Sequence, residues 1–177
     1  VNGKEYGSMG DAGKRENIPQ TDFFYDALTT SYVLKNDEIT LGLRFMTPLF
    51  ADDLEIMTRP VSYLALSCTT ADGSPAKIKI SAADELCLNL RGEGTVAGET
   101  IAFRGGKAVK MGNTEQKPLW RSGDNVRIDW GYFWLAAKGD ADTSFIDGSD
   151  GMKYAVLKKT VKSGENALIM FAYDDTE

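Results

Sequence analysis

The tightest groupings of side chains that could do chemistry are carboxylates. Asp52, Asp53 and Glu55 lie close together, and Asp84 is followed directly by Glu85. Paired carboxylates perform the acid and base steps of glycosidases, and carboxylate oxygens also bind calcium. Neighbouring side chains of a strand point to opposite faces, so Asp84 and Glu85 do not converge on one substrate if they lie in a strand. We interpret both groups as solvated, which is the usual state of acidic side chains.

The sequence contains no histidine. Histidine is the usual general base near neutral pH and the commonest metal ligand. Its absence excludes Ser-His-Asp triads, Cys-His dyads and His-based zinc sites. Acidic groups at 140–142, 147–150 and 174–175 have the composition of calcium loops, but none has the ligand spacing of an EF-hand. We predict no catalytic residue, no metal site and no cofactor in this chain.

The charge balance and the lengths of the apolar runs argue against a nucleic-acid partner and a membrane span. The chain has 177 residues, and its formal net charge is −6 because 26 acidic residues outnumber 20 scattered basic ones. Binding to a phosphate backbone needs clustered Lys and Arg, so we predict no nucleic-acid partner. No apolar stretch reaches the length of a membrane-spanning helix, so we predict no membrane span.

Alternation of apolar and polar residues predicts strands. It is clearest where Ile39, Leu41, Leu43 and Phe45 alternate with polar residues or glycine, after a hairpin turn at 36–37. The runs 61–70 and 76–90 flank the turn signal Asp72-Gly-Ser-Pro75, which predicts a second hairpin. Further strands are expected at 95–103, 107–111, 125–137 and 166–173, and the one candidate helix is 152–162.

Regularly spaced strands with turn residues between them favour an all-β fold, a two-sheet antiparallel β-sandwich with at most one short helix. We expect an irregular lead-in over residues 1–30 and a sandwich over 31–177, forming a single domain overall. The predicted core comprises Ile39, Leu41, Leu43, Phe45, Leu64, Leu66, Ile78 and Ile80.

Cys68 and Cys87 are the two cysteines. If 61–70 and 76–90 form a hairpin, the two residues lie roughly 30 Å apart at about 3.3 Å per strand residue. A disulfide needs Cα atoms within about 7 Å. We therefore predict two buried free thiols.

The run from 125 to 137 is the most aromatic part of the chain. In a strand, Trp130, Tyr132 and Trp134 share one face, and Asp129 and Phe133 share the other. We interpret it as a central strand with one buried face. The alternative is a set of exposed rings that bind a sugar or another protein.

Several stretches together resemble the β-sandwich domain of the glutaminase A family of secreted fungal and bacterial proteins. They are Leu41-Gly-Leu-Arg-Phe-Met-Thr-Pro-Leu-Phe50, Asp52-Asp-Leu-Glu-Ile-Met-Thr-Arg-Pro-Val-Ser-Tyr-Leu64, Asp72-Gly73 with the following strand, Arg121-Ser-Gly-Asp-Asn-Val-Arg-Ile-Asp-Trp-Gly-Tyr132 and Phe171-Ala-Tyr-Asp174. The resemblance covers most of 39–174.

The resemblance implies a parent protein in which the sandwich is followed by an (α/α) six-hairpin toroid that carries the active site. The expected function is that of a non-catalytic accessory domain of a glutaminase-like secreted hydrolase, docking on that C-terminal helical domain and shaping it. The expected location is secreted or periplasmic. The alternative is a carbohydrate-binding module of a glycosidase-like parent. We expect the 177-residue chain alone neither to release ammonia from glutamine nor to cleave glycosidic bonds.

We expect the interdomain contact either at the loop that carries Asp52, Asp53 and Arg59 or at the strand end that carries Asp129 and Tyr132. These positions belong to the resemblance yet include charges that a sandwich core does not need. The alternative is that they stabilise the sandwich itself, because Asp and Arg also fix loops through local hydrogen bonds.

Overall fold

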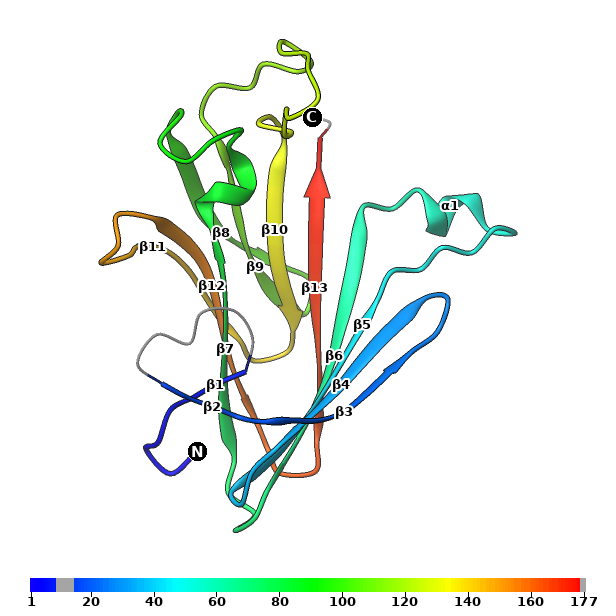
Figure 1. Cartoon of the computed structure of the whole chain (residues 1–177), viewed down its shortest axis with the longest axis vertical. Helices are drawn as coiled ribbons and strands as arrows, with labels where there is room; N and C mark the ends of the chain where they lie inside the picture. The colour runs from blue at the N-terminus through cyan, green and yellow to red at the C-terminus, as the bar shows by residue number, and fades with distance from the viewer. Residues whose placement is uncertain (9–14, 176–177) are drawn as a thin grey trace. The chain divides into compact units, whose positions relative to one another are not determined.

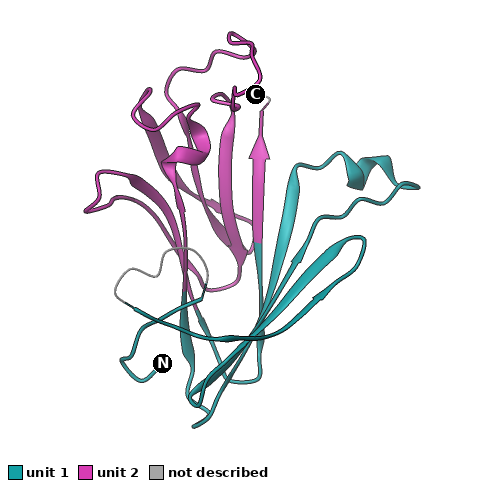
Figure 2. Ribbon diagram, in the orientation of Figure 1, with its two compact units in different colours: residues 1–78, 160–169 teal, residues 79–159, 170–177 magenta. Residues whose placement is uncertain are grey.

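A computed structural model describes residues 1–8 and 15–175. The fold is the predicted all-β antiparallel sandwich, and its single α-helix in the described residues has only four residues. The chain divides into two compact units (Figure 2), one of residues 1–78 and 160–169 and the other of residues 79–159 and 170–177. Here they are called unit 1 and unit 2. The prediction of one domain over 31–177 stays a prediction.

Unit 1 contains an antiparallel sheet in the order β3 (Gln20–Tyr25), β4 (Thr29–Lys35), β5 (Ile39–Met46) and β6 (Val61–Thr70), with β13 (Asn166–Asp174) beside β6 (Figure 1). The turn between β4 and β5 forms where it was predicted, because the Asn36 side chain accepts hydrogen bonds from the backbone N–H groups of Glu38 and Ile39. In β5, Leu41 lies opposite Cys68 and Leu43 lies opposite Leu66.

Most of the predicted core is confirmed. Five of its members are buried, namely Ile39, Leu41, Leu43, Leu64 and Leu66. Phe45 is half-buried, and so are Ile78 and Ile80 of β7 (Ala76–Ala83). The alternation therefore identified the inward face of each strand but not how completely that face is covered.

The predicted hairpin of 61–70 and 76–90 is wrong. Its turn forms, since Asp72 accepts hydrogen bonds from the backbone N–H and the hydroxyl of Ser74. Strand β6, however, has β5 and β13 as neighbours, whereas β7 pairs with β12. The backbone N–H of Gly164 donates to the Cys68 carbonyl, and the Ser163 hydroxyl accepts from Thr70 N–H. Both edges of β6 are therefore occupied, and β7 joins another sheet.

Unit 2 contains β8 (Val96–Phe103), β9 (Gly106–Asn113) and β10 (Tyr132–Lys138), with β13 beside β10. A second sheet has the order β11 (Asp142–Asp147), β12 (Lys153–Val161) and β7. Strand β11 packs over β8 and β9, where a Cβ on Gly98 would touch the ring of Phe145. The two sheets give unit 2 its two layers.

The candidate helix at 152–162 is wrong, because these residues form strand β12. Ala155, Val156 and Leu157 are all buried. A strand covered on both faces has a continuous apolar run instead of an alternating one, so its pattern is easily taken for a helix.

Three further segments differ from the sequence expectations. The lead-in contains β1 (Tyr6–Gly7), β2 (Glu16–Asn17) and strand β3, whose residues are all exposed to solvent. Strand β7 ends at Ala83, and Asp84–Cys87 form a 3-10 helix. The strand expected over 125–137 begins only at Tyr132, because Gly131 has φ +80°, which is not a strand conformation. A Cβ on Gly131 would also collide with the backbone of Asp174.

The two cysteines are free and buried, as predicted. The prediction of free thiols is confirmed, although the hairpin from which it was derived does not form. Cys87 lies in the 3-10 helix, and its Sγ donates a weak hydrogen bond to the Met111 carbonyl at 3.5 Å. Burial raises the pKa of the Cys87 thiol from its ordinary value of 9.0 to about 11.

This raised pKa predicts a pH dependence of stability. The unfolded thiol loses its proton near pH 9, whereas the folded thiol keeps it to about pH 11, so the contribution of Cys87 is fully present below pH 9 and is lost as the pH rises toward 11. We expect the free energy of unfolding to fall more steeply over this window in the wild type than in Cys87→Ala. Urea titrations at a series of pH values measure both slopes, and equal slopes would contradict the prediction.

Candidate functional site

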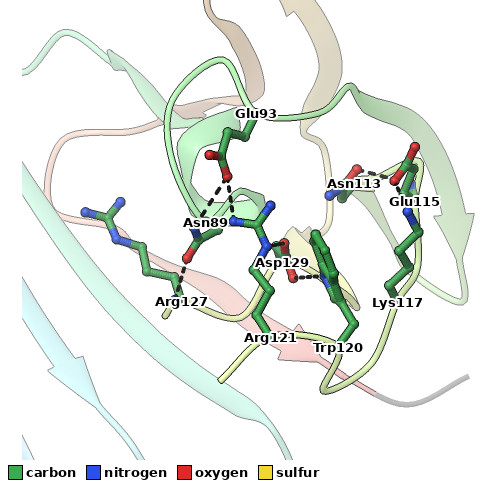
Figure 3. A network of polar contacts seen from close by, with 9 residues as sticks. All are labelled: Asn89, Glu93, Asn113, Glu115, Lys117, Trp120, Arg121, Arg127 and Asp129. Atoms are coloured by element: carbon green, nitrogen blue, oxygen red, sulfur yellow. Dashed lines mark hydrogen bonds and ion pairs between the residues drawn. The ribbon is translucent and has the colours of Figure 1, made fainter. Parts of the chain in front are cut away.

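The connection between β9 and β10 is unusually long for one without regular structure. Residues 114–131 contain neither helix nor strand. Loops of this length are usually either functional or disordered. This one is held in place by side chains, and Figure 3 shows that they come from the loop itself, from the end of β9 and from the turn after the 3-10 helix. We call the set the polar network; its members are Asn89, Glu93, Asn113, Glu115, Lys117, Trp120, Arg121, Arg127 and Asp129.

Asp129 is the most deeply buried charge of the polar network, with 5% of its surface exposed. The indole Nε1–H of Trp120 donates to its Oδ1 at 3.3 Å, and Arg121 Nε lies 4.0 Å from its Oδ2. A buried carboxylate is costly unless it is hydrogen bonded and paired with a charge. Trp120 and Arg121 provide both, so the loop is fixed around Asp129.

Arg121 connects this centre to the neighbouring turn. Its Nη1 donates to Glu93 at 2.7 Å, and its guanidinium carbon lies 4.2 Å from the centre of the Trp120 ring. Together with Asn89, it holds the pKa of the Glu93 carboxyl below its usual range. Lys117 lies 5.3 Å from the same ring centre, and Figure 3 shows the two cations on either side of Trp120.

Amide side chains close the remaining gaps in the loop. Asn89 is buried, and its oxygen accepts from the backbone N–H of Arg127 at 3.0 Å. Gln116 accepts from the backbone N–H of Gly131 and donates to the carbonyl of Asn113 at 2.6 Å. Backbone groups that have no ladder partner are thus satisfied by side chains, which keeps the loop ordered without strands.

The ordered loop presents apolar side chains to solvent. Leu119 is 80% exposed and Trp120 is 50% exposed. Leu119 also has φ +54°, in the left-handed region. A bulky side chain in this conformation costs about 1–2 kcal/mol, and such strain concentrates at functional positions. Other exposed apolar residues are Val126 and Ile128 of the same loop and Leu90 of the turn after the 3-10 helix.

The five residues predicted for the interdomain contact fall into two groups. In unit 2, Asp129 is the centre of the polar network, while Tyr132 begins β10 and has Lys110 Nζ 3.7 Å from its ring centre. In unit 1, Asp52, Asp53 and Arg59 are exposed around the helix α1 (Leu54–Met57).

Two of the unit 1 residues form local contacts. Asp53 accepts from the backbone N–H of Ile56 at 3.1 Å and so caps α1, and Arg59 donates to Glu55 at 2.6 Å. Both contacts are local to this loop. An interdomain contact by any of the five residues stays a prediction.

Sequence reasoning missed Leu119, Trp120, Arg121 and the residues of the 88–93 turn. The available signal was weak. A long, mostly polar stretch contains Leu-Trp-Arg directly after Pro118. The partners of Trp120 and Arg121 lie up to 28 residues away in the sequence, and no local pattern predicts such pairs.

The carboxylates of the polar network are all paired, and these pairs stabilise the conformation of the loop. Glu93 and Glu115 each face a basic side chain, and Asp129 faces an indole N–H and a guanidinium. Within residues 1–8 and 15–175, no group of three or more metal-ligating side chains is placed to hold a metal ion. None of the helices in that part of the chain is long and apolar enough to cross a membrane.

The burial of Asp129 predicts a stability effect. Asp129→Ala removes the acceptor of Trp120 Nε1 and one of the two carboxylates that face Arg121, which keeps Glu93, so we expect a loss of about 1–3 kcal/mol in the free energy of unfolding. Chemical denaturation measures this loss, and near-UV circular dichroism reports on Trp120. The control is Asp124→Ala, at an exposed position of the same loop. If both variants lose equally little, Asp129 does not stabilise the loop.

Residues 28–167 match the sequence family described as a domain of unknown function, DUF5127. No curated protein matches the chain. The matched segment contains the whole polar network together with β4 to β12. Because it covers well over half of the 177 residues, the chain belongs to the DUF5127 family.

Proposed function

We propose that the chain is a non-catalytic accessory module of a larger, glutaminase-like secreted hydrolase. In this proposal the module docks on a C-terminal helical domain of the parent protein through the 114–131 loop. The resemblance to the glutaminase A family motivates the identity of the parent, its location and the helical partner. The contact surface is argued from the geometry of the loop.

One observation carries the docking proposal: Leu119 is both strained and exposed. A leucine with φ +54° and 80% exposure gains nothing from the fold of its own unit. Asn or Gly would occupy this conformation at lower cost. Burial of a leucine side chain against a partner contributes about 1.5–3 kcal/mol, which offsets the strain.

The bracing of the loop supports the same proposal. A surface that is ordered before binding loses little conformational entropy when it docks. The loop of unit 2 is ordered by Asp129, Arg121 and Glu93, and its half-exposed Trp120 is of a residue type enriched among the central anchors of protein interfaces.

The alternative, a sugar that stacks on Trp120, is less favoured at this loop. Stacking needs a free aromatic face, and both Arg121 and Lys117 lie over the Trp120 ring. A protein partner can bury the exposed edge of this ring together with Leu119 without displacing either cation.

Unit 1 offers a second candidate contact at α1. Leu49, Phe50, Leu54 and Met57 are exposed there beside Asp52 and Asp53. This turn combines apolar side chains with a charged rim, as interfaces do, so we propose it as a second contact of unit 1 taken by itself.

Replacement of Leu119 tests the docking proposal. In the isolated chain, Leu119→Gly removes the strain, so we expect the free energy of unfolding to rise by about 1 kcal/mol. In the full-length parent the same change should weaken the coupling between domains, so that the sandwich and the remainder unfold in two calorimetric transitions instead of one.

The matched control is Ile146→Thr, at an exposed apolar position of β11 in the same unit. It should leave the calorimetric profile of the parent unchanged. A Leu119→Gly variant that destabilises the isolated chain while the parent unfolds as the wild type does would show that Leu119 serves the sandwich itself, and would overturn the proposal.

A further inference from the structure

Strand β3 of unit 1 is an open sheet edge. It is the first strand of its sheet, with β4 on one side and no strand among the described residues on the other (Figure 1). Protein sheets usually block such an edge with lysine, proline or a bulge. Strand β3 has a register shift between Gln20 and Asp22, but the half beyond it consists of Phe23, Phe24 and Tyr25, all exposed. This half is therefore free to pair with another strand.

The backbone groups of Phe23 and Tyr25 point away from β4. The N–H of Asp26 donates to the carbonyl of Thr29, and the direction of the backbone groups alternates along an antiparallel strand. Phe24 therefore bonds to β4, whereas Phe23 and Tyr25 face the open edge. In the part of the chain that the structure describes, no other group takes up their outward N–H and C=O groups. An added β-strand satisfies such a row of donors and acceptors, whereas a helix uses its own backbone groups internally.

Aromatic rings extend the buried face of unit 1 to this edge. Tyr32 lies between Phe23 and Leu43 in the strand register, and Leu43 is buried. The ring centres of Phe23 and Tyr32 are 5.2 Å apart, and those of Phe23 and Tyr25 are 5.7 Å apart. Phe23 is nevertheless 48% exposed and Tyr25 is 77% exposed. The apolar face thus ends uncovered at the same residues whose backbone groups are open.

We propose that β3 pairs antiparallel with β3 of a second copy of this chain, about a twofold axis at Phe23. In this register Phe23 lies opposite Phe23 of the second copy, and Tyr25 lies opposite Thr21. Each Phe23 then exchanges both of its open backbone hydrogen bonds with the other. The aromatic rings of the two copies meet across the axis, so the face that ends at the edge of one copy continues into the other.

Charge selects this register over its neighbours. A twofold axis at Asp22 would place Asp22 opposite Asp22 of the other copy, and an axis at Phe24 would place Asp22 opposite Asp26. Like charges directly opposite each other destabilise a strand pair. With the axis at Phe23, Asp22 lies opposite Phe24 and no two charges face each other along β3. The strand is thus complementary to itself, as a twofold interface requires.

This inference goes beyond the proposed docking function and does not depend on it. The docking loop at 114–131 belongs to unit 2, whereas β3 belongs to unit 1. The docking proposal also concerns a helical partner, which offers no open strand edge to β3.

Sedimentation equilibrium of the intact chain, from micromolar to millimolar concentration, tests the proposal. We expect a monomer–dimer equilibrium in the wild type. Phe23→Lys places two ammonium groups opposite each other, so the dissociation constant of the dimer should rise roughly tenfold or more. A wild type that stays monomeric over the whole range would overturn the proposal.

The matched control is Phe24→Lys. It also replaces an exposed phenylalanine of β3 by lysine, but it places the lysine opposite Asp22 of the second copy, so it should dimerise at least as tightly as the wild type. Circular dichroism checks that both variants are folded. Equal weakening by the two substitutions would indicate non-specific apolar association and would also overturn the proposal.

A second measurement needs no variant. Hydrogen exchange followed by NMR should show that the amide of Phe23 exchanges more slowly as the concentration of the chain rises, because its N–H becomes bonded only in the dimer. The amide of Phe24, which faces β4, should not depend on concentration. A Phe23 amide that is protected only in the full-length parent would assign this edge to another segment of the parent and contradict the pairing of two copies.

Discussion

The carboxylate of Asp129 is buried in a segment that has no helix or strand, and the order of the surrounding loop depends on it. A charge at that depth must be hydrogen bonded and paired with an opposite charge. Trp120 and Arg121 meet this requirement, and Arg121 extends the contact to Glu93 on the turn after the 3-10 helix. One buried charge thus brings together two segments that are separate in the sequence.

The sheets provide the frame on which this loop is built. Strands β9 and β10 pair along their length, with Phe133 opposite Met111 and Leu135 opposite Val109. Rigid strand ends keep the two ends of the loop in place, which is how scaffolds commonly carry functional loops. The polar network thus keeps Leu119 at an exposed position.

Much of the fold could be predicted where one face of a strand is buried and the other is not. Ile39, Leu41 and Leu43 gave a clear alternation, and Asn36 identified the turn before them. The same reasoning failed for β12, whose apolar run is covered on both faces. It also failed for the partner of β6, because the turn at Asp72 determines only that the chain reverses, while occupied strand edges decide which strands pair.

The candidate site was less predictable than the fold. Asp129 and Tyr132 were singled out, but as members of one strand that in fact starts at Tyr132. The glycine at 131, with φ +80°, ends the apparent alternation by turning the chain. Contacts such as Arg121 with Glu93 join residues far apart in the sequence. Neither the composition nor a local sequence pattern predicts which such residues pair. The strain at Leu119 is likewise a property of the folded backbone alone.

The central claim is that the 114–131 loop is an ordered surface, braced around Asp129 and available to a partner. Hydrogen exchange followed by mass spectrometry on the intact chain tests it most directly. The account predicts that peptides containing the bonded N–H groups of Glu115, Arg127 and Gly131 exchange slowly in the wild type and rapidly in Asp129→Ala. Rapid exchange throughout the loop of the wild type, at the rate of an unstructured peptide, would contradict it.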